Sequence, residues 1–131
     1  RRDFQPSEAL ERPHVMVAMN VFAADTEAEA RLLASSQQQS FVRLRSGNPG
    51  KLPPPIAGYT DTLPATAQAM LAHIGQAAAV GTPAQVREGI EAFVARTGAD
   101  EIMLCGATYE PAARIRSLEI TLDACRAMVA A

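Results

Sequence analysis

The fold class can be inferred from one apolar run, His14-Val15-Met16-Val17-Ala18-Met19-Asn20-Val21-Phe22-Ala23-Ala24. A breaker, Arg12-Pro13, precedes it, and Asp25 and Thr26 end it. The run is too short and too rich in strand-forming residues for a good helix. Strands of parallel sheets are covered on both faces and read as nearly continuous apolar runs. The stretch therefore predicts a strand that is buried on both faces of a parallel sheet.

A long helix is expected directly after this strand. Thr26 and Glu29 have the spacing of a capping box, in which the hydroxyl accepts from the backbone of Glu29 and the carboxylate reaches back. The helical pattern continues to about Arg45. The apolar residues expected on one face of this helix are Ala30, Leu33, Phe41 and Leu44, with Gln37 as a polar member of the stripe.

A loop, a second helix and a short strand follow. Residues 46–58 contain four prolines and three glycines and predict a loop with a stiff triplet, Pro53-Pro54-Pro55. Pro64 opens a helix that reaches about Gln76. Residues 77–80 are a strand candidate although alanine is a poor strand former. The inward residues of this helix are expected to be Ala67, Met70, Leu71 and Ile74.

The turn Gly81-Thr82-Pro83 is the clearest local signal in the chain. Thr82 suits an N-cap, Pro83 the first helical position, and Gln85 completes a second capping box. Gly98 is placed to end this helix as a left-handed residue. The expected buried stripe consists of Val86, Ile90, Phe93, Val94 and Thr97.

A third strand and a last helix complete the pattern. Residues 101–106 predict the strand, and Pro111 opens the helix. Apolar residues recur in that helix at intervals of three and four, which predicts an inner face. This face consists of Ile115, Leu118, Leu122, Cys125 and Val129.

Strands that alternate with helices indicate an α/β fold with parallel pairing through right-handed crossovers. The 131 residues form one domain, residues 1–131, with about three strands. A three-stranded parallel sheet leaves two open edges and cannot close on itself. The chain is therefore a compact open α/β unit, a piece of a larger fold, or one subunit of a homo-oligomer that completes the sheet.

Composition excludes several classes of function. The net charge of −2 arises from mixed acidic and basic residues, which gives no electrostatic footprint for nucleic acid or an anionic membrane. No apolar stretch is long enough to span a bilayer. Cys105 and Cys125 are too far apart for a metal knuckle and too few for a disulfide framework, so both are expected to be buried small apolar residues. A reducing, cytoplasmic setting follows from this cysteine usage.

Three blocks of the sequence, in this order and spacing, resemble luciferase-like monooxygenases. The first is residues 4–31, which includes the opening strand, and the second is residues 41–55, with the proline triplet. The third runs from Val80-Gly81-Thr82-Pro83 through residue 94 and continues over residues 97–104. The resemblance covers nearly the whole chain.

The resemblance implies a partial (β/α)₈ TIM barrel, because members of this family are barrels that bind FMN or a deazaflavin at the mouth. A complete barrel typically takes about 250 residues. The strands found here would be the last ones of such a barrel, and Arg1 would fall in the preceding helix. The missing initiator methionine fits this expectation of a C-terminal fragment. The glycine-rich segment that holds the flavin phosphate lies upstream in the family, so no catalytic or cofactor-binding residue can be carried over.

The remaining candidate residues have structural alternatives. A phosphate could sit on the N–H groups at Gly81-Thr82, although a plain helix cap is the favoured interpretation of this turn. Asn20 interrupts an apolar strand, so it either makes a structural hydrogen bond or lines a ligand site. Gln37, Gln38 and Gln39 would satisfy one another or form a polar seam between subunits. His14, His73 and Cys105 have no local companions that indicate metal binding or nucleophilic catalysis, and Arg114 and Arg116 are compatible with an acidic partner.

The sequence is therefore compatible with two functions. The first is a flavin-dependent monooxygenase acting on a small organic substrate with reduced flavin and oxygen, of which this chain is a part that does not bind flavin alone. The second is a non-catalytic α/β module that oligomerises or binds a ligand. In both cases we expect a homo-oligomer, typically a dimer, that buries the sheet edges and apolar helix faces.

Overall fold

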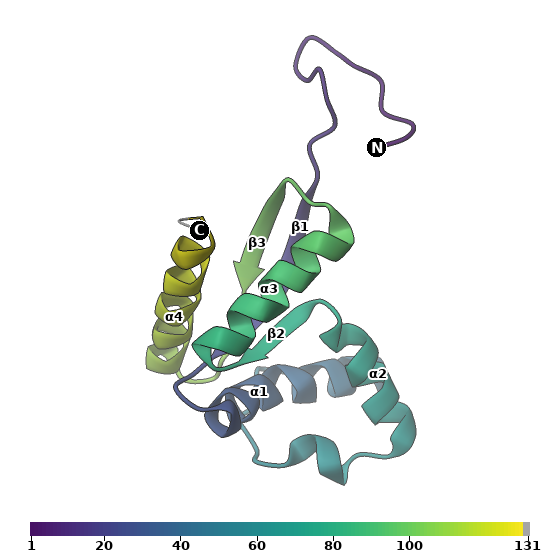
Figure 1. Ribbon diagram of the computed structural model, residues 1–131. Coiled ribbons are helices and arrows are strands. Elements are labelled where there is room, and N and C mark those ends of the chain that lie inside the picture. The colour runs from purple at the N-terminus through teal and green to yellow at the C-terminus, as the bar shows by residue number, and fades with distance from the viewer. Residues whose placement is uncertain (130–131) are drawn as a thin grey trace.

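A computed structural model describes residues 1–129, except for the side chain of Val129. The elements are β1 (Met16–Ala23), α1 (Glu27–Arg45), the 3₁₀ helix η1 (Tyr59–Thr62), α2 (Ala65–Gly75), β2 (Ala78–Gly81), α3 (Pro83–Thr97), β3 (Glu101–Cys105) and α4 (Pro111–Val129). The predicted order of strands and helices is confirmed, and η1 is an addition within the loop region. The first 15 residues form an extended arm (Figure 1).

The sheet is parallel, with the order β2-β1-β3. The carboxyl half of β1 pairs with β2, from Asn20 opposite Ala78 to Ala23 opposite Gly81. The amino half pairs with β3, from Met16 opposite Glu101 to Asn20 opposite Cys105. The central strand therefore has a neighbour on each edge, and the α/β class with three parallel strands is confirmed.

Helices α3 and α4 cover one face of the sheet, as Figure 1 shows from the covered side. The side chains of β1 that point to this face alternate along the strand, because a strand has a period of two. Local signals start and end α3 as predicted: Gln85 Oε1 accepts the Thr82 N–H at 2.9 Å, and Gly98 ends the helix with a φ of 58°. The buried core of this face consists of Met19, Val21, Ala23, Ala79, Val86, Ile90, Phe93 and Ile120.

Helices α1 and α2 lie beyond the carboxyl ends of the strands (Figure 1). The predicted capping box of α1 is half formed. Thr26 Oγ1 accepts the Glu29 N–H at 3.2 Å, but among the described residues the Glu29 carboxylate does not accept the Thr26 N–H in return. The four residues predicted to point inward from α2 are all at least partly buried. This layer covers the second face of the sheet only at its carboxyl end.

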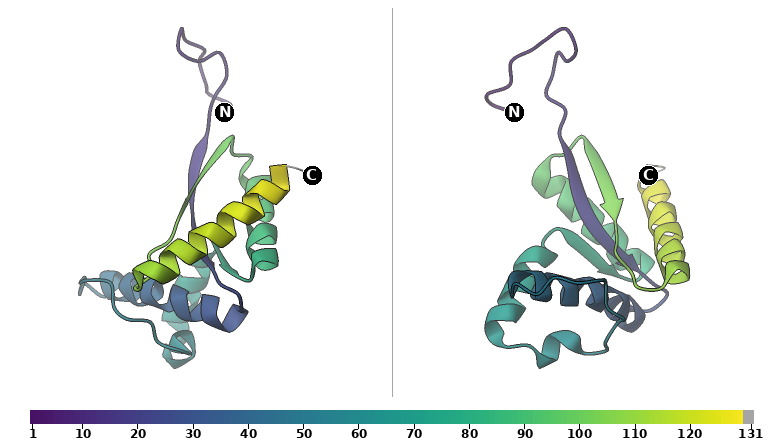
Figure 2. Two further views of the ribbon diagram at one scale, coloured as in Figure 1. Left: turned by 90° about the vertical axis from the view of Figure 1, so that its left-hand side faces the viewer. Right: turned by 180° about the vertical axis from the view of Figure 1, so that it is seen from behind.

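The expectation that β1 is buried on both faces is wrong for its amino half. Met16 and Ala18 are exposed, whereas Phe22 is buried by the α1–α2 layer. Met103, which pairs with Ala18, is also exposed. Seen from behind, β1 and β3 have no helix in front of them (Figure 2). We call the residues Met16, Ala18, Met103 and Cys105 the open sheet face.

The predicted inner face of α4 is wrong at three of its residues, although Cys125 does pack against the core. Ile115, Leu118 and Leu122 are 60%, 43% and 51% exposed, and Cys125 is only half-buried, while the side chain of Val129 lies outside the described residues. Both sides of α4 have helical spacing, so periodicity alone could not choose between them. We call Ile115, Leu118 and Leu122 the α4 stripe. The residues that α4 buries instead are Ser117, Ile120, Thr121 and Ala124.

A hydrogen bond explains this choice of face. Ser117 Oγ accepts the Ala23 N–H at 2.8 Å in a buried position, and Thr121 Oγ1 donates to the Ser117 carbonyl at 2.7 Å. A buried backbone N–H without a partner would cost about 1–3 kcal/mol. The small polar side of α4 therefore faces the end of β1.

The apolar stripe expected on α1 is correct at Ala30 and wrong at Leu44, which is 57% exposed. The buried side of α1 is largely polar because it holds the proline-rich loop. Gln39 Nε2 donates to the Pro54 carbonyl at 2.9 Å, and Ser35 Oγ accepts the Ile56 N–H at 2.8 Å. The loop therefore packs on α1 of its own chain.

Replacing Gly106 with alanine should destabilise the fold. A Cβ atom there would overlap the Val21 carbonyl oxygen, which is backbone and cannot move without disturbing β1. We expect a loss of about 2 kcal/mol or more in the free energy of unfolding, measured with urea. The matched control is Gly75→Ala, where a Cβ meets nothing within 4 Å. Equal stability of the two variants would contradict this packing.

The hydrogen bonds that attach the N-terminal arm to Asp100 should make the free energy of unfolding depend on pH. The Val15 N–H and then the Arg1 guanidinium, both hydrogen-bonded to Asp100, lower the pKa of its carboxyl below 3.8. Its stabilisation is thus present above pH 3.8 and is lost as pH falls through the folded-state pKa. Asp100→Asn should be less stable than the parent at pH 6, and the difference should shrink below pH 3.8. A pH-independent difference in urea unfolding would contradict this assignment.

Candidate functional site

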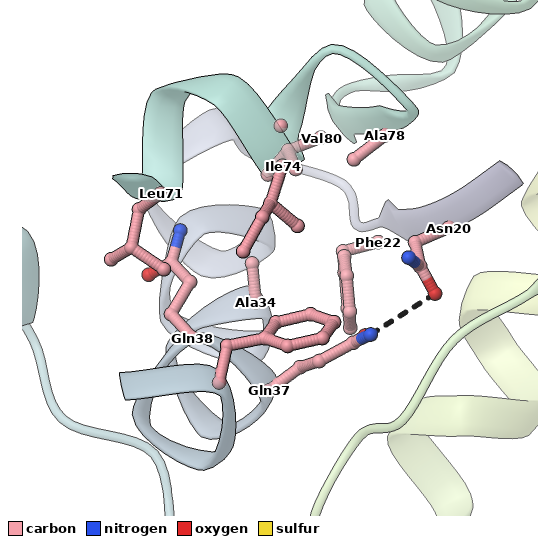
Figure 3. A pocket seen from close by; sticks show the side chains of 11 residues that line it. Asn20, Phe22, Ala34, Gln37, Gln38, Leu71, Ile74, Ala78 and Val80 are labelled. Carbon is pink, nitrogen blue, oxygen red and sulfur yellow. Dashed lines mark hydrogen bonds between the residues drawn. The ribbon is translucent and has the colours of Figure 1, made fainter. Parts of the chain in front are cut away.

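A pocket of about 190 Å³ lies between α1, α2, β2 and the carboxyl half of β1 (Figure 3). We call it the inner pocket. Strand β1 supplies Asn20 and Phe22, two residues apart and therefore on the same face of the sheet. Helix α1 supplies Gln37 and Gln38. The apolar side chains that line the pocket are Phe22, Phe41, Leu71, Ile74 and Val80, with Ala34 and Ala78 between them.

An amide pair forms one end of the inner pocket. Gln37 Nε2 donates to Asn20 Oδ1 at 3.1 Å, as the dashed line in Figure 3 shows. Cys105 Sγ, at the end of β3, lies 3.5 Å from the same oxygen. Asn20 therefore makes the structural hydrogen bond that its place in an apolar strand required, and it also lines a pocket. The structural interpretation of this residue is confirmed, and a ligand role stays a prediction.

The three glutamines do not satisfy one another, which corrects that expectation. Gln37 bonds to Asn20, and Gln39 bonds to the Pro54 carbonyl. Gln38 has no hydrogen-bond partner among the described residues. The buried Gln37 Oε1 is also without a partner in the described part of the chain, which costs about 1–3 kcal/mol for a group of this kind.

A larger, open groove of about 770 Å³ adjoins the inner pocket. It runs between the first turns of α1 and residues 56–61, and its lining includes charged residues such as Glu27, Arg31 and Asp61. We call it the outer groove. Ala34, Gln38 and Val80 line both spaces, so Gln38 stands at the boundary between them.

The Gly81-Thr82 turn does not fit a flavin phosphate. The Thr82 N–H, which an anion would need, donates to Gln85 Oε1, and Gln85 Nε2 in turn donates to Glu27 Oε2 at 3.1 Å. Hydrogen bonds from Gln85 and Arg31 hold the pKa of Glu27 below its usual value, so this carboxylate is ionised at neutral pH. A negative charge beside the helix N-terminus disfavours a phosphate there. The turn is a helix cap.

The histidines and cysteines are not brought together. His14 Nε2 lies 3.0 Å from Glu101 Oε2 at an exposed site, and His73 is exposed in the last turn of α2. Among residues 1–129, no group of three or more His, Cys, Asp or Glu side chains could hold a metal ion. The expectation that Cys105 is buried is wrong, because it ends β3 on the open sheet face. Cys125 is half-buried, which raises the pKa of its thiol.

Arg116 has its acidic partner within the chain. Its guanidinium lies 2.9 Å from Asp25 Oδ1, which ties the start of α4 to the turn after β1. Arg114 is exposed. No helix in the described part of the chain is long and apolar enough to cross a membrane.

Sequence reasoning identified Asn20 and Gln37 but missed Phe22, Gln38 and Ile74 as lining residues of one pocket. Phe22 and Ile74 were read as core residues of separate elements. The sequence held a signal for this pocket. Residues 20 and 22 lie on one face of a strand, and residues 37 and 38 lie on the helix that follows that strand. Only the packing of α2 against α1 closes the space between them.

Comparison with known proteins finds relatives that match nearly the whole chain. It is 39% identical over 123 residues to the luciferase-like monooxygenase of Escherichia coli K12, covering 94% of this chain and 37% of that protein. The uncharacterized protein YvbT of Bacillus subtilis gives the same identity and coverage. No family model matches the chain. The chain thus spans little more than a third of the length of these relatives.

A solved structure shares the fold. The crystal structure of apo-MsnO8 superposes with a TM-score of 0.72 and 21% sequence identity, covering 96% of this chain and 39% of that one. The arrangement of strands and helices described above therefore also occurs within a longer chain of known structure.

The Asn20–Gln37 pair can be tested by a double-mutant cycle. Asn20→Val alone should cost about 1–3 kcal/mol, because it leaves Gln37 Nε2 without its acceptor. Adding Gln37→Leu removes both amides and should recover part of that loss, with a coupling of about 1 kcal/mol in urea unfolding. Gln5→Leu, in the exposed arm, is the matched control. Strict additivity of the two changes would show that the bond contributes nothing.

Proposed function

Since the chain belongs to the luciferase-like monooxygenase family, we propose that it forms the closing wall of a flavin-dependent oxidoreductase barrel. The whole protein would oxidise a small organic substrate with reduced flavin and oxygen. FMN or a deazaflavin is the expected cofactor. This proposal concerns the protein as a family member of full length, because the chain itself spans 37% of its E. coli relative.

The observation that carries the proposal is the unequal covering of the sheet. Parallel sheets are buried on both faces in α/β proteins. Here α3 and α4 cover one face, while Met16 and Met103 on the open sheet face are 49% and 55% exposed. In a barrel the helices lie outside and the opposite face points inward, where side chains from the other strands fill the interior. An open apolar face on a parallel sheet fits a barrel wall better than a free-standing sheet.

Two features of the described residues argue against a flavin site within this chain. The helix N-terminus at Thr82 is capped by Gln85 beside the Glu27 carboxylate, and the inner pocket is smaller than the 300–1,000 Å³ typical of cofactor pockets. We therefore assign the flavin-binding groups to other parts of a full-length barrel. No step of the reaction is assigned to residues of this chain.

The isolated chain should not bind flavin. Titration of FMN, followed by its fluorescence, is expected to show no saturable binding at micromolar concentrations. A chimera in which this chain replaces the matching 123 residues of the E. coli relative should retain flavin binding and oxygen consumption that depends on reduced flavin. Micromolar binding by the chain alone, or a folded chimera without flavin binding, would contradict the proposal.

A second candidate is a non-catalytic module that assembles with copies of itself. The observation that favours it is the α4 stripe, whose spacing of three and four residues presents one apolar ridge to solvent. A homodimer would bury this ridge and the free edge of β3. Both cysteines are free, which fits a reducing compartment such as the cytoplasm.

Sedimentation should separate the assembled form from a monomer. We expect a dimer that dissociates when Leu118→Glu and Leu122→Glu are introduced into the α4 stripe. Ala127→Glu, an exposed change on another side of the same helix, should leave the mass unchanged. A folded monomer of the unaltered chain at tens of micromolar would rule out this second candidate.

A further inference from the structure

The inner pocket has the walls of a site for an aromatic ring. Phe22, which is 3% exposed, forms one wall, and Ile74 and Leu71 from α2 face it across the space (Figure 3). Val80 and Ala78 close the side formed by β2. Most of the lining is therefore apolar, and its polar members are three amide side chains, Asn20, Gln37 and Gln38.

The volume of the inner pocket limits the size of a ligand that it could bind. An engineered apolar cavity of about 150 Å³, lined by Leu, Ile and Phe, stays dry and binds benzene. The inner pocket, at about 190 Å³, has room for one six-membered ring with small substituents. A tricyclic flavin ring or a long acyl chain is too large for this space.

The amide groups that line the inner pocket differ in whether their hydrogen-bonding atoms already have partners. At one end Gln37 Nε2 donates to Asn20 Oδ1, while the buried Gln37 Oε1 has no partner among the described residues. Figure 3 shows the Gln38 amide on the other side of the pocket, close to Leu71. This amide has no partner within residues 1–129, so both its donor and its acceptor remain free for a ligand. Gln38 also borders the outer groove, which provides a route into the pocket.

We propose that the inner pocket binds a compact aromatic molecule with one hydroxyl or carbonyl substituent, the ring against Phe22 and the substituent on the Gln38 amide. This site lies wholly within the chain. It requires neither flavin nor the rest of a barrel, so the inference stands or falls separately from the proposed function.

Titration of the full chain with p-cresol, followed by ¹H–¹⁵N and methyl NMR, tests the proposal. We expect saturable shifts at the Gln38 side-chain amide and the Leu71 and Ile74 methyl groups, with a dissociation constant on the order of 0.1–1 mM for a ligand of this size. Toluene, which lacks the hydroxyl, should bind more weakly. Gln38→Leu should remove this preference, with p-cresol affinity falling about tenfold and toluene affinity unchanged or higher.

Filling the pocket provides the decisive variant. Ala78→Leu places a larger side chain into the space from β2 and should abolish p-cresol binding. Ala69→Leu, on the exposed side of α2, is the matched control and should bind normally. If Ala78→Leu does not fold, Ile74→Phe fills the same space from α2.

Three results would overturn the inference. The first is the absence of saturable shifts up to the solubility limit of p-cresol. The second is shifts confined to the open sheet face or the α4 stripe, which would place the ligand on a general apolar surface. The third is unchanged binding by a folded variant whose pocket is filled.

Discussion

Side chains of a β-strand alternate between two faces, so burying an apolar strand requires a separate covering on each side. For β1 the two coverings are unequal. Helices α3 and α4 enclose the face with Met19 and Val21 along the whole strand. The other face is covered only near Phe22, where α1 and α2 reach back over the carboxyl ends of the strands. The inner pocket lies at this partial covering, and the open sheet face begins where the covering stops.

The burial of α1 depends on hydrogen bonds as much as on apolar contact. Its least exposed positions include Ser35, Ser36 and Gln39, and two of these side chains bond the backbone of the proline-rich loop. Prolines lack an N–H, so such a loop depends on its carbonyls and its few remaining donors for attachment. This polar attachment leaves the neighbouring Gln37 and Gln38 to face the sheet and the pocket.

The candidate site could be anticipated only in part from the sequence. Asn20 was recognisable because a polar residue within an apolar strand needs partners, and its bond to Gln37 satisfies that need. The local pattern at Gly81-Thr82 favoured a helix cap but was also compatible with an anion site. The choice depends on Glu27, which lies 58 residues from Gln85 in sequence and forms a hydrogen bond with it in the fold. No local pattern reports such a contact.

Local sequence signals were enough to predict the order of the strands and helices, because caps, prolines and breakers act over a few residues. Thr26, Pro83 and Gly98 each start or end a helix where local chemistry requires it. Tertiary structure alone decided which side of a helix or strand is buried. Helix α4 has apolar residues on two sides, and the Ala23 N–H, which needs an acceptor, selects the side with Ser117 over the side with Leu118. Likewise, β1 is apolar on both faces, but only packing determines which of them is covered along the whole strand.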